Sequence, residues 1–209
     1  VRIDSKRNYA YITESGLGAI IAVNLASGEA KRLLDDHPST KAEKELKLVV
    51  QGVELRDDKS GSTPEIHPDG IALSDDGEHL YYHALTGKAL YRVPTAALRG
   101  ESDSLSESPI GEQVEKVAQT VVTDGMLVDE RGNVYHTALE RDAIVRFNSE
   151  SKVMESVVKD QSIAWPDSMA WGPDGALYFT TSQIHRMPRF NKGQSTRTEP
   201  YRIYKIAMK

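Results

Sequence analysis

The sequence contains no cysteine, so disulfide bonds and thiol catalysis are excluded for its 209 residues. It has no run of basic residues, and its formal net charge of −5 gives no indication of nucleic-acid binding. No apolar stretch approaches the roughly 20 residues that a membrane-spanning helix needs. Hydrophobic residues make up 39% of the chain, which is compatible with a globular β protein.

The chain does contain a repeated segment. Three clear copies begin at His67, Thr123 and Trp165, and a weaker copy begins at Val1. Each clear copy places an Asp and a small residue before a short apolar run. A polar turn with glycine and a second apolar run centred on tyrosine follow. Such repeats bury their faces against one another, so the period of the repeat predicts the architecture.

The spacing of the copies predicts a β-propeller. Asp69, Asp124 and Asp167, which open the clear copies, are 55 and 43 residues apart. A four-stranded blade occupies roughly 40–50 residues, so each copy fits one blade with its loops. Asp-Gly and Thr-Gly pairs between the apolar runs are typical of hairpin turns, because glycine supplies the positive φ that they need. We therefore expect an all-β chain, a single propeller domain over residues 1–209 with about four blades.

The remaining elements are less regular. We expect the outer strands at residues 31–34, 114–118 and 153–158. A short helical turn over residues 95–98 is expected to be capped by Thr95 and ended by Gly100. Residues 35–68 form a long insertion rich in charge, Ser, Pro and Gly, which predicts a surface segment. Within it, residues 46–55 favour strands.

The ends of the chain differ from those of a closed propeller. Val1 aligns with a position in the middle of an inner strand, not before it. The last segment, residues 201–209, aligns with the third strands of the other copies. The last blade therefore lacks an outer strand. We expect an arc that corresponds to the C-terminal two-thirds of a larger ring. Missing N-terminal blades, or a partner chain, are expected to close it.

Four segments resemble the major royal jelly protein/yellow family. They are DDHPST at residues 35–40, PDGIALS with LYYHAL after it, TDGM with GNVYHTALE after it, and RMPRFNKG with PYRIYKI after it. The resemblance implies a six-bladed propeller, of which about four blades are present. It also implies an extracellular or periplasmic location, because members are mostly secreted. Some members bind small aromatic amines in the central channel, and others are associated with dopachrome conversion.

The inner strands are also similar, more distantly, to those of the gluconolactonase/senescence-marker family. There the residue before the glycine coordinates a divalent metal at the channel mouth. Asp124 matches the family's metal-binding Asp, and Asp69 stands where that family usually has Asn. The similarity implies that these two residues bind Ca²⁺ or another divalent cation. Asp167 falls on a blade that supplies no ligand in that family.

Repeat geometry alone also brings the three Asp residues together. Inner strands converge on the propeller axis, so Asp69, Asp124 and Asp167 are expected to form a rim of carboxylates. Like charges at short range raise one another's pKa unless a cation such as Ca²⁺ compensates them. The alternative is structural: each Asp accepts hydrogen bonds from the backbone of adjacent turns.

One histidine and one tryptophan are further candidates. His83 occupies the position that Thr13, Thr137 and Thr180 hold in the other copies, near a channel-facing strand end. It is either an acid, base or ligand, or a hydrogen-bonded structural residue. Trp165 precedes a strand, where it either lines the channel or caps the blade.

These observations predict binding of a small aromatic or cyclic molecule at the channel mouth. The expected contact residues are Asp69, Asp167, His83, Thr137, Thr180 and Trp165. The alternative is an enzyme, a metal-assisted lactone hydrolase or a dopachrome-type (tautomerase) isomerase, with Asp124 and His83 as catalytic residues. A third possibility is a protein-interaction platform on residues 35–68. The fold cannot decide between these functions, because propellers carry all of them.

Overall fold

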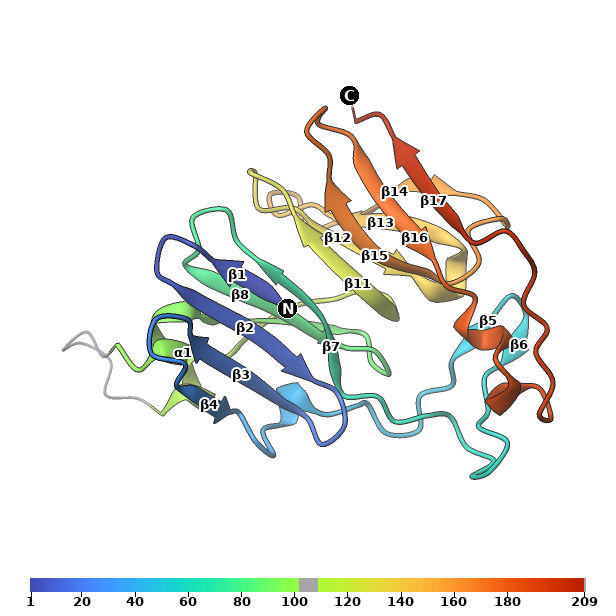
Figure 1. Cartoon of the computed structure of the whole chain (residues 1–209), viewed down its shortest axis with the longest axis horizontal. Coiled ribbons are helices and arrows are strands. Elements are labelled where there is room, and N and C mark those ends of the chain that lie inside the picture. Colours follow the sequence, from blue (N-terminus) through green and yellow to red (C-terminus); the bar gives the residue numbers. More distant parts are fainter. Residues whose placement is uncertain (102–108, 209) are drawn as a thin grey trace.

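The structure is a computed structural model that describes residues 1–101 and 109–208. Apart from one two-stranded hairpin, the strands of the described residues form four antiparallel sheets that follow one another in sequence order, from blue to red in Figure 1. Each sheet is a simple meander in which consecutive strands pair, as in a propeller blade. The predicted all-β propeller architecture is confirmed, with four blades in this chain.

The four blades are named here I to IV. Blade I contains β1 (Arg2–Asp4), β2 (Tyr9–Glu14), β3 (Ala19–Asn24) and β4 (Ala30–Leu33). Blade II contains β7 (Pro68–Leu73), β8 (His79–Ala84), β9 (Ala89–Pro94) and β10 (Glu115–Gln119). Blade III contains β11 (Thr123–Val128), β12 (Val134–Ala138), β13 (Ala143–Phe147) and β14 (Met154–Lys159). Blade IV has three strands, β15 (Pro166–Trp171), β16 (Leu177–Thr181) and β17 (Arg202–Ile206).

The elements outside the blades are short. They are the hairpin of β5 (Val49–Val50) and β6 (Val53–Glu54), the helix α1 (Thr95–Arg99), and five 3₁₀ turns at Pro38–Thr40, Ile110–Gln113, Leu139–Arg141, Ile184–Arg186 and Pro188–Phe190. The expected outer strands lie within one residue of β4, β10 and β14. Gly100 ends α1 with φ 75°, as predicted. The predicted cap is wrong: Thr95 is the first helical residue, and its hydroxyl donates instead to the carbonyl of Gly77.

The core lies between neighbouring blades rather than inside any one of them. Side chains alternate between the two faces of a strand, so the adjacent residues Tyr81 and Tyr82 enter different interfaces. Tyr82 packs between blades I and II with Tyr11 and Ile20, and Tyr81 packs between blades II and III with Met126. Each blade therefore depends on its neighbours for burial, as expected of a repeat fold.

Most of the insertion is exposed or half-buried, as its composition predicts, but some of its residues belong to the core. Leu48, Val50 and Leu55 are buried around Trp165, within the same cluster as residues of blades II and III. The hairpin β5–β6 lies beside the red segment that precedes β17, far from it in sequence (Figure 1). Arg189 of that segment forms an ion pair with Asp57 of the insertion. The insertion thus contacts blade IV through the segment that precedes β17.

The inner strands of blades II, III and IV share an irregularity in their register. It falls at the Asp of each repeat, between Pro68 and Gly70, between Thr123 and Met126, and between Pro166 and Met169. A bulge leaves a residue outside the regular pairing and redirects its side chain. The three Asp residues thus lie at the same end of the inner strands.

Across the described residues, no helix is long and apolar enough to cross a membrane.

Candidate ligand-binding site

The structure brings Asp69, Asp124 and Asp167 into one pocket of about 180 Å³ at the start of the inner strands. We call it the mouth pocket. Its other lining residues are Val1, Arg2, Gly70, Ile71, Gly125, Met126, Ser168 and Met169. Each Asp comes from a different blade, so the site exists only because the blades pack side by side. The convergence expected from the repeat is therefore present in the structure.

The repeated threonines hold the backbone of the Asp segments. The Thr13 hydroxyl donates to the carbonyl of Asp69 at 2.8 Å. The Thr137 hydroxyl accepts from the amide groups of Asp124 and Gly125 at 3.1 and 2.8 Å, and the Thr180 hydroxyl accepts from Ser168 at 3.2 Å. Thr137 has no exposed surface. The structure thus gives Thr137 and Thr180 a supporting position behind the pocket instead of the direct ligand contact that we expected.

Glycine at position 125 is required by the approach of blades III and IV. A Cβ atom there would lie 1.9 Å from the carbonyl oxygen of Asp167, closer than any real contact allows. Any larger residue would push the two blades apart at the mouth pocket. The small residue after the repeated Asp is thus explained here by close packing.

The three carboxyl groups differ in their surroundings. Burial, and then the charge of Asp167, raises the pKa of Asp69. Within the described residues its carboxylate accepts no hydrogen bond. Burial, followed by the charges of Asp167 and Asp69, raises the pKa of Asp124 to about 8. Asp124 Oδ2 accepts a hydrogen bond from Trp165 Nε1 at 2.7 Å, and Asp167 Oδ1 accepts one from the Ser168 hydroxyl at 3.1 Å.

The described residues supply only two of the ligands expected for a metal site. Asp69 and Asp124 offer hard oxygen ligands, the type that Ca²⁺ prefers. However, among the residues that the structure describes, no group of three or more His, Cys, Asp or Glu side chains is arranged to hold a metal ion. Ca²⁺ takes six to eight oxygen ligands. The residues described here do not by themselves make a calcium site.

His83 does not reach the mouth pocket, which corrects its proposed role as a catalytic or ligand-contacting residue. It has no exposed surface, its Nδ1 is 2.6 Å from the carbonyl of Ala84, and its Nε2 is 3.0 Å from the Thr120 hydroxyl. Burial lowers its pKa to about 4. The ring packs edge-on against His136, with centroids 5.9 Å apart. His83 is a hydrogen-bonded structural residue, the alternative that the sequence left open.

Trp165 is 1% exposed, so it does not line the channel. Its indole ring lies parallel to the ring of His185, with centroids 5.9 Å apart and an interplanar angle of 11°. It contacts the site only through its N–H group, which donates to Asp124. Of the two possibilities for this residue, the structure shows the capping one.

Sequence reasoning missed two contributors to the site. Arg2 lines the mouth pocket and donates from Nη2 to the carbonyl of Met126 at 2.6 Å. It stands on an inner strand where the other copies carry Ala72, Leu127 and Ala170, so a charged residue at an apolar repeat position was the available signal. His185 lies against the Trp165 ring and supports it, and no sequence signal pointed to it.

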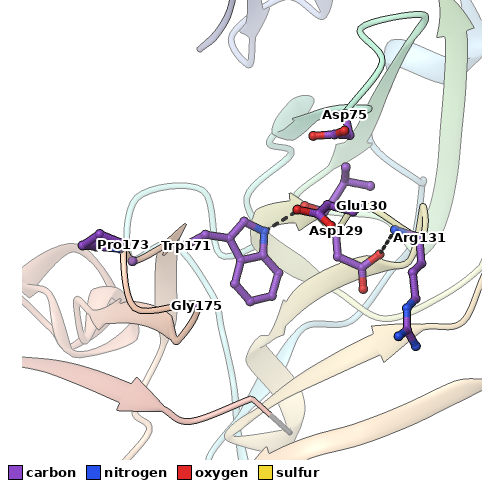
Figure 2. A pocket seen from close by; sticks show the side chains of 9 residues that line it. Asp75, Asp129, Glu130, Arg131, Trp171, Pro173 and Gly175 are labelled. Carbon is purple, nitrogen blue, oxygen red and sulfur yellow. Dashed lines mark hydrogen bonds between the residues drawn. The ribbon is translucent and has the colours of Figure 1, made fainter.

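A larger pocket of about 480 Å³ lies at the opposite ends of the inner strands (Figure 2). Figure 2 shows the Trp171 ring between the turn that contains Pro173 and the turn that contains Asp129. The Trp171 N–H donates to the carbonyl of Val128 at 2.9 Å. The Asp129 carboxylate accepts four hydrogen bonds from its own hairpin. Because these polar groups are already satisfied, the mouth pocket is the better candidate despite its smaller volume.

The arrangement defines the class of protein: a β-propeller arc whose inner strands present carboxylates at one end. The chain belongs to the major royal jelly protein family, whose sequence model matches residues 1–208. No curated protein sequence matches this chain.

Several solved structures are similar to this chain at low sequence identity. A nidogen/laminin complex is 15% identical, with a TM-score of 0.53, and the match covers 97% of this chain and 81% of that one. A gluconolactonase from Xanthomonas campestris is 19% identical, with a TM-score of 0.47 over 66% of this chain and 43% of that one. A calcium-binding regucalcin from Agrobacterium tumefaciens is 17% identical, with a TM-score of 0.42 over 88% and 81%. At these identities the similarity concerns the fold alone.

Proposed function

We propose that the mouth pocket binds a small cationic molecule, with aromatic amines as the first class to test. The proposal rests on one observation: three carboxyl groups from three blades share a pocket of about 180 Å³. Burial, and then the charges of the neighbouring carboxylates, raise the pKa values of Asp69 and Asp124. A bound ammonium group relieves that repulsion, so it is the ligand charge that the pocket favours.

The apolar part of the ligand has a counterpart in the lining. Ile71, Met126 and Met169 border the pocket beside the carboxyl groups. Methionine adapts to irregular shapes and makes favourable contacts with aromatic rings. A pocket smaller than the usual 300–1,000 Å³ of drug-binding sites suits a single-ring molecule. The family resemblance favours the same class, because some members bind small aromatic amines.

The test compares phenethylamine with 2-phenylethanol, which replaces the ammonium group by a hydroxyl. By isothermal titration calorimetry at pH 7, we expect the amine to bind at least tenfold more tightly. Asp69→Asn should reduce amine affinity tenfold or more, because it removes a carboxylate that accepts no hydrogen bond within the described residues and is therefore free to bind the ammonium group. Asp129→Asn, at the far end of the inner strands, is the matched control and should bind normally. Equal binding of the two compounds, or an unaffected Asp69→Asn variant, would overturn the proposal.

A lactone hydrolase is the second candidate. The observation that favours it is the joint presence in one pocket of Asp69 and Asp124, the two residues that resemble metal ligands. A metal bound there would act as a Lewis acid on a lactone carbonyl. Glucono-δ-lactone hydrolysis that requires Ca²⁺ and is lost in Asp124→Asn would support this function. Phenethylamine binding that is unaffected by a chelator would support the first.

Three further expectations stay predictions. They are an extracellular or periplasmic location, closure of the arc by further blades or a partner chain, and an interaction platform on residues 35–68. For the interaction platform, a partner could contact only the outer side of the insertion, because its inner residues are buried against the rest of the protein.

A further inference from the structure

Arg2 reaches from blade I past the inner strand of blade II to blade III. It lies on β1, and its Nη2 donates to the carbonyl of Met126 on β11 at 2.6 Å. Gly70 of blade II lets blade III come this close, because a Cβ atom at Gly70 would lie 2.9 Å from Sδ of Met126. The Arg2 side chain is thereby held in the lining of the mouth pocket.

The positive charge of Arg2 has no anionic partner among the described residues. Both hydrogen bonds of its guanidinium group go to backbone carbonyls, from Nη1 to Val1 at 3.1 Å and from Nη2 to Met126. Arg2 is half-buried, whereas the more deeply buried Arg99 forms an ion pair with Glu101 at 2.6 Å. The remaining N–H groups of Arg2 are therefore available to an anionic group of a ligand.

The carboxyl groups of the pocket have no ion-pair partner within the described residues either. The Asp69 carboxylate accepts no hydrogen bond there, and Asp167 accepts one from the uncharged Ser168 hydroxyl. Charges of both signs thus line one pocket of about 180 Å³ without neutralising each other. The inner strands fix the carboxyl groups, and Met126 holds the guanidinium group. Opposite charges that are fixed in this way favour a ligand that carries both signs.

We propose that Arg2 binds a carboxylate, so that the ligand of the mouth pocket is an amine that also carries a carboxylate, as an aromatic amino acid does. The ammonium part of this inference rests on the proposed function, and Arg2 adds the anionic part. The planar guanidinium group matches a carboxylate through two parallel hydrogen bonds. A phosphate group also fits a guanidinium group, but its higher negative charge is opposed by the three carboxyl groups of the pocket.

The first experiment uses the unmodified protein and three related molecules: phenethylamine, L-phenylalaninamide and L-phenylalanine. The amide has nearly the shape of the amino acid but no negative charge. Isothermal titration calorimetry at pH 6 keeps the α-amino groups protonated. We expect L-phenylalanine to bind about three- to tenfold more tightly than L-phenylalaninamide, because only the amino acid gives Arg2 an anionic partner. Equal binding, or weaker binding of the amino acid, would overturn the role of Arg2.

The second experiment asks whether this preference depends on Arg2. Arg2→Gln keeps a donor for the Met126 carbonyl but removes the charge, so it should bind L-phenylalanine no more tightly than the amide. It should bind phenethylamine at least as well as the wild type, because the lost charge repels a cation. Arg131→Gln, which changes an exposed arginine at the far end of the inner strands, is the matched control and should keep the preference. A preference that persists in Arg2→Gln contradicts the proposal.

A fourth compound, 3-phenylpropanoate, has the carboxylate without the ammonium group and separates the two proposals. If phenethylamine binds and L-phenylalanine has no advantage over the amide, the role of Arg2 fails and the proposed function stands. If phenethylamine does not bind but 3-phenylpropanoate binds and is lost in Arg2→Gln, the proposed function fails and the role of Arg2 stands. If no compound binds, both fail.

The guanidinium ¹⁵N signals of the wild type decide the question if Arg2→Gln does not fold. The Arg2 signal should shift when L-phenylalanine is added and should stay in place with L-phenylalaninamide, because only the carboxylate contacts the guanidinium group. Equal shifts with the two compounds would overturn the role of Arg2.

Discussion

Aspartates lie at both ends of the inner strands, and their pKa values are shifted in opposite directions at the two ends. At the mouth pocket the pKa values of Asp69 and Asp124 are raised. At the hairpin turns the pKa of Asp76 is lowered, and that of Asp174 is lowered to about 2. The Asp residues at both ends belong to the same repeated segments. The difference between their pKa values therefore arises from the groups around each carboxylate.

Hydrogen-bond donors account for the contrast. Asp76 Oδ1 accepts from the Ser74 hydroxyl and the Glu78 amide, and Asp174 accepts from Lys205, the Ala176 amide and the Tyr178 hydroxyl. These donors favour the ionised form. Asp124 has a single donor and faces two other carboxylates. An Asp with several local donors shapes a turn, whereas an Asp with few is available to a ligand.

The strongest test of this comparison replaces one Asp at each end of the inner strands. Asp129→Ala should reduce the free energy of unfolding by about 2–4 kcal/mol, because four donors of its hairpin lose their acceptor. Asp124→Asn should not reduce it at pH 7 and should raise it, because Asn keeps an acceptor for Trp165 and removes a carboxyl group that folding holds protonated while the unfolded chain ionises it. Urea denaturation, with an unchanged m-value, measures both.

The pH dependence of the free energy of unfolding provides the control for these two variants. A carboxyl group whose pKa is raised by folding keeps its proton in the folded state while the unfolded chain releases it. Stability therefore falls as pH rises from about 4 to about 8, and Asp124→Asn should flatten this part of the profile. A loss in Asp124→Asn as large as that in Asp129→Ala would show that the mouth Asp is also structural.

A second comparison concerns the two buried histidines. Both ring nitrogens of His136 lack a partner among the described residues, whereas both nitrogens of His83 have one. His136→Phe should therefore raise the free energy of unfolding by about 1 kcal/mol at pH 7. His83→Phe should lower it, because the Thr120 hydroxyl and the Ala84 carbonyl each lose a partner. Equal losses in both variants would indicate that His136 is also hydrogen-bonded, through water.

The effect of His136→Phe should grow in acid. Burial lowers the pKa of His136 well below its usual value, so the folded state stays neutral while the unfolded chain binds a proton below about pH 6.5. Stability is thus present above this pH and is lost as pH falls. His136→Phe should show a larger gain over the wild type at pH 5 than at pH 7. Thermal unfolding at the two pH values measures the difference.

The repeat made most of the fold predictable. Periods of 55 and 43 residues between the Asp positions, with glycine turns, were enough to place the inner strands and the convergence of three carboxylates. These features depend on local patterns that each copy repeats. The outer strands are less regular in sequence, yet their predicted positions lie within one residue of β4, β10 and β14.

The supporting parts of the site were not predictable, because they depend on contacts across the molecule. Leu48 and Val50 stand in a polar insertion, and nothing local indicated that they cover Trp165. The role of His83 was misjudged because a departure from the repeated threonine is also what a structural substitution produces. In the structure its ring nitrogens meet Thr120 and Ala84, and the former is 37 residues away.

The smallest effect is expected for Lys205→Ala at the turn end. Lys205 Nζ is 2.6 Å from Asp174 Oδ2, but both side chains are largely exposed, and exposed ion pairs contribute little to stability. We expect no resolvable change in urea denaturation. The hydrogen bond from Lys205 is the first cause of the low Asp174 pKa, so the variant should raise that pKa from about 2 toward its usual value. A ¹³C-carboxyl titration measures the shift. An unchanged pKa would mean that the Ala176 amide and the Tyr178 hydroxyl alone separate this Asp from those of the mouth pocket.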